Sequence, residues 1–266
     1  MPVMTVASER TQARRSLMAW LSTVLVALTC AAATAAGAAW VGWRAAGPLP
    51  SDVQAREIVA PLVPGAPVRL GQRDDSLFGY SGGGSLSRLL GDDRFNSGHV
   101  DVALGSTTSD QVQAAMRNAG WQVDTDADLG VSARKGGVAA LLYQQGGSVT
   151  IELLRSRPGP VRPLELIGWV AGLLLGWIVA LRLIAARRAA WIVGAGSAVL
   201  LLPATVLTTG QLFAESVLPS TITPPALWGD YASFVVHPLA LLGAVLGVPA
   251  LVLLVWPARG RPALDG

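Results

Sequence analysis

The sequence predicts a helical membrane protein with four transmembrane helices and one small α+β domain outside the membrane. Composition is the first reason, because 52% of the 266 residues are apolar and only 14% are charged, which is unusual for a soluble domain. The second reason is patterning. The mean hydropathy of +0.48 averages four long, nearly uncharged runs with one polar segment, residues 47–162, which separates the first run from the second.

The first uncharged run extends from Ser16 to Trp43. At about 1.5 Å of rise per residue, it exceeds the roughly 20 residues that a helix needs to cross a bilayer. The second run is interrupted only by Glu165 near its start. The expected helices cover residues 18–43, 163–186, 189–214 and 231–257, with terminal tails at 1–17 and 258–266 and a loop at 215–230.

Arginines beside these runs predict the orientation, because Lys and Arg near the ends of a span stay in the cytoplasm. They precede the first span, separate the second from the third, and follow the fourth: Arg10, Arg14, Arg15, Arg187, Arg188, Arg259 and Arg261. The loop 215–230 contains no Lys or Arg. We therefore expect a multi-pass protein of the cell membrane with both termini in the cytoplasm and residues 47–162 outside.

The N-terminus has a second interpretation. Two arginines before an apolar core, followed by small residues such as Ala33-Thr34-Ala35, are also typical of a cleavable signal peptide. However, the uncharged run is long for a signal core, and Trp40 and Trp43 suit an anchor at the outer membrane interface. We expect the segment to stay as a span. The single cysteine, Cys30, excludes an intramolecular disulfide.

Residues 47–162 are numerous enough to bury a core of their own. Ser51 is expected to cap a helix that runs to about Ala60, and Thr108 or Ser109 a second helix that ends at Gly120. Alternating apolar residues predict a strand over Val100, Val102 and Leu104, and three more strands at Trp121–Asp124, Val138–Gln144 and Ser148–Arg155. The simplest assembly is an antiparallel meander covered by one or two helices.

Two patterns in this domain resemble parts of catalytic sites, but neither has the other residues that catalysis would need. Gly79-Tyr80-Ser81-Gly82-Gly83 matches the G-x-S-x-G of a nucleophile elbow, but that elbow needs a much larger parallel sheet. We interpret residues 81–85 as a glycine-rich loop before a short helix near 86–90. His99 and Asp101 are expected on one face of a strand, where they could share a proton, but no nucleophile accompanies them. We therefore predict no catalytic residue.

Asp124, Asp126 and Asp128 alternate as the first ligands of a calcium loop do. The sixth position is Leu129 rather than Gly and the twelfth is Lys135 rather than Glu, which excludes an EF-hand. A weaker calcium site at the three aspartates stays open beside the simpler interpretation, a solvated acidic turn. We otherwise predict no metal and no cofactor, since two histidines cannot make a His-rich metal cluster.

Regularly spaced glycines form the clearest pattern in the expected spans. Gly168, Gly172 and Gly176 recur at every fourth position of the second span, and Gly243 and Gly247 do so in the fourth. Such a stripe allows another helix backbone to approach closely. The approaching helix could belong to the same bundle or to a second protein, and both possibilities stay open.

These patterns together predict a non-enzymatic integral membrane protein, in contact with the lipid bilayer, whose external domain binds a membrane or envelope protein partner or another envelope component. Topology explains the excess of arginine, so we expect no nucleic acid partner. The order of one span, a large external domain and three more spans is similar to that of small permease subunits, as in bacterial cell-division and macrolide-export complexes, which partner a cytoplasmic ATPase. This resemblance in arrangement implies a permease-like subunit of a transport complex as an alternative, although the segment 182–190 offers little of their coupling segment. An envelope hydrolase is the third possibility.

Overall fold

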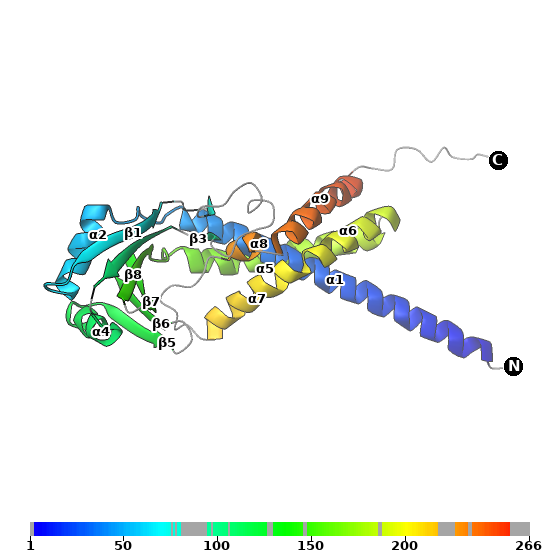
Figure 1. Cartoon of the computed structure of the whole chain (residues 1–266). Helices are drawn as coiled ribbons and strands as arrows, with labels where there is room; N and C mark the ends of the chain where they lie inside the picture. Colours follow the sequence, from blue (N-terminus) through cyan, green and yellow to red (C-terminus); the bar gives the residue numbers. More distant parts are fainter. Residues whose placement is uncertain are drawn as a thin grey trace.

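The computed structural model describes residues 3–75, 77, 79–80, 95–96, 98–105, 107–126, 130–145, 148–185, 188–217, 227–233 and 236–255. Within these residues, a six-stranded antiparallel sheet with its helices lies at one end of the molecule, and long apolar helices lie at the other (Figure 1). The expected combination of apolar helices with a separate helix-covered sheet is confirmed.

In the described part of the chain, three helices are long and apolar enough to cross a membrane: α1 (Val3–Trp43), α5 (Val161–Ala185) and α9 (Val236–Val255). The apolar part of α1 is Leu17–Trp43. Because α1 already begins at Val3, the helix extends through most of the segment that we expected to be a tail. A short helix, α8 (Gly229–Ala232), precedes α9.

The third expected span is broken. Its two parts, α6 (Arg188–Leu200) and α7 (Leu202–Val217), are bent by 54° relative to each other. Pro203 explains the bend, because proline has no amide hydrogen and its ring clashes with the preceding turn of a helix. Regular helical hydrogen bonding is present again at Thr205, whose amide and hydroxyl each donate to the Leu201 carbonyl at 2.9 Å. The pair can be one bent span or a re-entrant loop.

The sheet has the strand order β1-β4-β8-β7-β6-β5, and every neighbouring pair is antiparallel. Its strands are β1 (Val68–Asp74), β4 (His99–Leu104), β5 (Gln122–Asp126), β6 (Gly130–Lys135), β7 (Val138–Gln145) and β8 (Ser148–Arg155). The four expected strands correspond to β4, β5, β7 and β8. Strands β1 and β6 were not among them, and β6 completes an antiparallel meander from β5 to β8. A separate ribbon pairs β2 (Gly79–Tyr80) with β3 (Phe95–Asn96).

The two helices of this domain begin where the sequence predicts. Ser51 caps α2 (Asp52–Val59), and Thr108 caps α4 (Ser109–Asn118). Each cap is a capping box, in which the residue three positions later bonds back to the cap residue's backbone. A short 3-10 helix, η1 (Ala60–Leu62), follows α2, and Gly120 beyond α4 adopts a φ of +79°.

One face of the sheet forms the core of the domain. Val100, Val102 and Leu104 of β4 are almost fully buried there, together with alternate residues of β8. Helices α2 and α4 cover this face with the buried side chains of Ala55, Val59, Val112 and Met116 (Figure 1). Because side chains alternate along a strand, the residues between these positions lie on the opposite face.

A second apolar cluster joins the sheet domain to the long helices. Trp43 at the end of α1 packs edge to face against Trp228, with ring centroids 5.8 Å apart and an interplanar angle of 89°. Val161 at the start of α5 is fully buried in the same cluster. The chain therefore enters and leaves the sheet domain beside one packed junction.

Candidate functional site

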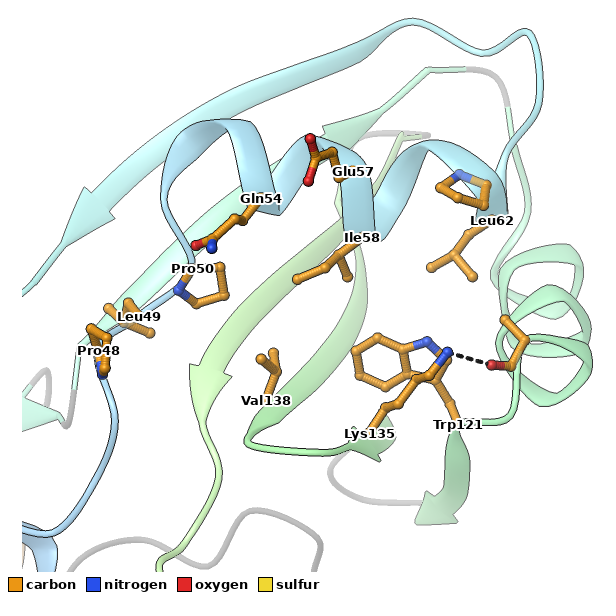
Figure 2. A pocket seen from close by; sticks show the side chains of 12 residues that line it. Pro48, Leu49, Pro50, Gln54, Glu57, Ile58, Leu62, Trp121, Lys135 and Val138 are labelled. Carbon is orange, nitrogen blue, oxygen red and sulfur yellow. Dashed lines mark hydrogen bonds between the residues drawn. The ribbon is translucent and has the colours of Figure 1, made fainter.

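A groove of about 630 Å³ lies on the sheet domain between α2, η1 and the turn that joins β6 to β7 (Figure 2). In the close view, Ile58 and Leu62 project from one side toward Trp121 and Val138 on the other. Trp121 is 7% exposed, so its ring forms part of the core as well as of the wall. The remaining apolar wall is supplied by Pro48, Leu49, Pro50 and Pro61.

The groove has a polar rim. Gln54 and Glu57 of α2 line one edge, and Lys135, the last residue of β6, lines the other. The Lys135 ammonium donates to the Ala119 carbonyl at 2.7 Å, which holds it beside Trp121. The Ser51 capping box fixes the first turn of α2, and this helix positions Gln54 and Glu57 at the rim.

An apolar hollow of this size with a few polar groups at its edge is typical of a binding site. Among the described residues, the twelve that line the groove include no serine, cysteine or histidine, and one carboxylate, Glu57. The groove therefore offers contacts for an apolar group rather than a nucleophile paired with a base.

A second arrangement lies on the opposite face of the sheet. The register pairs Asp101 of β4 directly with Glu152 of β8, and His99 lies two residues before Asp101 on the same face. One nitrogen or oxygen atom from each of the three side chains lies within 4.8 Å of the other two. His99 Nδ1 is 3.9 Å from Glu152 Oε1. The sequence predicts that His99 and Asp101 share a face, but it gives no sign of Glu152 beside them.

This face of the sheet is partly withdrawn from water, and His99 is only 8% exposed. Burial raises the pKa of both Asp101 and Glu152, because desolvation penalises the carboxylate form. Tyr143 of β7 lies near Asp101 and Glu152, and burial together with these two carboxylates raises the pKa of Tyr143 to about 12. Gly71 of β1 lies close by, since a Cβ added there would be 3.1 Å from the Asp101 Cβ.

The calcium candidates lie elsewhere. Asp124 and Asp126 are in β5, paired with Ser132 and Gly130 of β6, and Asp128 lies outside the described residues. A calcium site there stays a prediction. Of the G-x-S-x-G pattern, the first two residues form β2, whereas residues 81–85 and the expected helix at 86–90 lie outside the described part of the chain.

The glycine stripe of α5 faces α1. A Cβ added at Gly168 would lie 2.7 Å from the Thr34 carbonyl oxygen, and one at Gly176 would lie 2.7 Å from the Cα of Ala27. A Cβ at Gly172 would overlap the Thr34 side chain. The Thr34 hydroxyl donates to the Gly168 carbonyl at 2.7 Å, which links the two helices directly. The stripe is therefore occupied by a helix of the same chain.

The glycines of α9 face α6. Ser197 of α6 donates its hydroxyl to the Gly243 carbonyl at 2.7 Å. A Cβ at Gly243 would lie 2.7 Å from Leu201 Cγ, and one at Gly247 would lie 3.1 Å from Ser197 Oγ. Glycine thus allows the same kind of close helix contact at a second place.

Sequence reasoning missed one further pair. It treated Glu165 as an interruption near the start of the second span, but the Glu165 side chain is 2% exposed and forms an ion pair with Arg157. Arg157 lies between β8 and α5, so the pair sits where the sheet domain continues into the long helix. An acidic residue at a span terminus with an arginine eight residues earlier was the signal that could have revealed it.

No protein-family model, curated protein or solved structure matches this chain. The function is therefore inferred from the two arrangements on the sheet domain and from the long apolar helices.

Proposed function

We propose that this chain is a non-enzymatic integral protein of the cell membrane whose sheet domain lies outside and binds an apolar group of an envelope protein partner in the groove between α2 and Trp121. The groove is the observation that carries the proposal. Apolar side chains from the 48–50 segment, α2, η1 and β7 converge there on one tryptophan. Buried tryptophan is enriched among the residues that dominate binding energy at protein interfaces.

The groove is suited to a side chain presented by another protein. Pro48, Pro50 and Pro61 stiffen its edges, so little conformational entropy is lost when a ligand enters. Glu57 and Gln54 are exposed at the rim, where they can bond to the backbone of an incoming segment. An apolar side chain of a partner protein would fill the groove, and the polar backbone around that side chain would bond to the rim.

The membrane part of the proposal is supported by the long helices and their surfaces. Large apolar side chains are exposed along them, among them Leu174 of α5, Phe213 of α7 and Val245 of α9. Such surfaces are stable against lipid rather than water. In addition, α1 begins and α9 ends on the side away from the sheet (Figure 1), which agrees with the arginine placement and with two cytoplasmic termini.

A photo-crosslinking amino acid at Glu57, on the groove rim, tests the proposal in the native membrane. Val53 is the matched control, because it lies on the same helix, is 62% exposed and does not line the groove. We expect a protein adduct from position 57 and none from position 53. The variant Ile58→Trp fills the groove and should abolish the adduct at 57.

Equal adducts at both positions, or an adduct at 57 that Ile58→Trp leaves unchanged, would contradict binding in the groove. Purification in mild detergent distinguishes this proposal from its main alternative, a permease-like subunit of a transport complex. A cytoplasmic ATPase that co-purifies with the wild type and with Ile58→Trp to the same extent would favour the permease-like subunit.

A further inference from the structure

Three side chains that can ligate a metal converge on two adjacent strands, on the face of the sheet away from α2 and α4. Their donor atoms all lie within 4.8 Å of one another. Ligands of a single tetrahedral Zn²⁺ lie about 3.3–3.5 Å apart, given metal–ligand distances of about 2.0–2.2 Å. His99 Nδ1 and Glu152 Oε1, at 3.9 Å, are already near this spacing. Small side-chain rotations would bring the three donors to one ion.

The charge balance of this face favours a cation. Asp101 and Glu152 are paired across β4 and β8, and both are partly withdrawn from water. Within the described residues, Asp101 Oδ1 is buried and accepts no hydrogen bond. A buried carboxylate oxygen without a partner is costly, and two adjacent carboxylates repel each other. A doubly charged ion would remove both costs.

The donor set distinguishes between kinds of cation. An imidazole nitrogen beside two carboxylates suits a transition metal such as Zn²⁺, whereas Ca²⁺ and Mg²⁺ prefer oxygen ligands alone. Tyr143 of β7 lies on the same face beside Asp101, where its hydroxyl is placed to give the outer support that metal ligands commonly have. The Glu152 side chain is 23% exposed, so an ion can reach the site from solvent.

We infer that His99, Asp101 and Glu152 form a binding site for one divalent transition-metal ion of the Zn²⁺ class. The site is separate from the groove, which lies on the other side of the sheet. Three protein ligands leave at least one coordination position for water or for a donor group of another molecule. The inference therefore adds a metal-dependent function to the domain and does not depend on what the groove binds.

Zinc titration of the full chain tests the inference. The protein is purified in detergent without a polyhistidine tag, stripped with a chelator, and titrated with Zn²⁺ in competition with a chromophoric chelator. We expect one Zn²⁺ per chain and no displacement by excess Ca²⁺ or Mg²⁺. His99→Gln and Glu152→Gln should lose stoichiometric binding, and Tyr143→Phe should weaken it about 10–100-fold.

The second histidine provides the control, because the chain contains only two. His237 lies in α9, where its Nδ1 is 2.8 Å from the Tyr231 carbonyl oxygen, and His237→Gln should bind Zn²⁺ as the wild type does. Circular dichroism establishes that each variant is folded, and Glu152→Gln, which keeps the side-chain volume, suffices if His99→Gln does not fold. The site is wrong if the wild type binds no Zn²⁺, or if the folded site variants bind it as tightly as His237→Gln.

Discussion

At the scale of single residues, the ion pair between Glu165 and Arg157 is a largely buried contact that we expect to contribute to stability. Both side chains are largely withdrawn from water, with 2% and 15% exposure. Removing one partner of such a pair is costly, because the remaining buried charge loses an oppositely charged neighbour. The pair also lies at the point where the sheet domain continues into α5, so its loss would loosen the connection between the two.

We predict that Glu165→Ala lowers the free energy of unfolding by about 3–5 kcal/mol, because the largely buried Arg157 loses its carboxylate partner. Replacing both residues with apolar side chains, Arg157→Met with Glu165→Leu, should recover most of this loss. Unfolding of the full chain in detergent measures both. Glu57→Ala, which removes an exposed carboxylate, serves as the control and should change stability by less than about 0.5 kcal/mol. A loss of similar size in Glu165→Ala and Glu57→Ala would show that the pair contributes nothing.

At the scale of elements, the sequence predicts those that carry their own local signals. Helices α2 and α4 each begin at a capping box, which is written within four consecutive residues. Strands β1 and β6 were missed because pairing with neighbouring strands stabilises them, and this pairing leaves no local pattern in their sequences. The sequence of β1 is mostly polar, and its pairing with β4 joins residues about thirty positions apart. The break in the third span was missed because a proline is tolerated within a span whenever neighbouring helices satisfy the backbone.

The candidate metal site was predictable only in part, for the same reason. Residues two apart on one strand share a face, which places His99 with Asp101 from sequence alone. Glu152 joins them through the register of β4 against β8, and Tyr143 through that of β8 against β7. Register depends on the whole sheet, so a pairing across fifty residues cannot be deduced from local patterns. The groove likewise combines segments that are distant in the chain.

The contact between α1 and α5 gives a prediction at this scale. Gly172→Ala should lower stability by about 1–3 kcal/mol, because the added methyl group overlaps Thr34 and would lie 2.8 Å from the Ala31 Cα. Gly210→Ala in α7 is the matched control, since a Cβ there meets nothing within 4 Å, and it should leave stability unchanged or raise it by up to about 1 kcal/mol. Thermal unfolding in detergent measures both. Equal stability of the two variants would mean that α5 does not pack against α1 through this stripe.

At the scale of the whole molecule, the number of spans in the proposed membrane topology depends on whether α6 and α7 cross together or turn back. At about 1.5 Å per residue, their 13 and 16 residues are each shorter than a typical span. If the bent pair crosses once, the chain has four spans and both termini lie on one side. If the pair turns back, there are three spans and the termini lie on opposite sides.

Thiol labelling in intact cells tests this point, because Cys30 is the only cysteine and can be replaced by alanine. Single cysteines are introduced at Ser8, at Ala114 on the exposed side of α4, and at Ala263, and an impermeant reagent is applied. We expect labelling at position 114 alone. Labelling at both 114 and 263 would identify α6–α7 as a re-entrant pair, and labelling at 8 with protection at 114 would reverse the orientation.

The packing of α1 against α5 has a consequence for how the protein is made. The two helices are partners, yet Trp43 and Val161 are 118 positions apart in the sequence. At a synthesis rate of about 5–20 residues per second, α1 is complete roughly 6–24 s before α5 begins to appear. During this interval Thr34 can keep its hydroxyl satisfied within its own helix, since it also bonds to the Cys30 carbonyl at 2.7 Å. If the protein is inserted in a membrane as we propose, α1 is therefore already helical there while the ribosome synthesises the sheet domain. Helix α5 then packs against a helix surface that has formed before it.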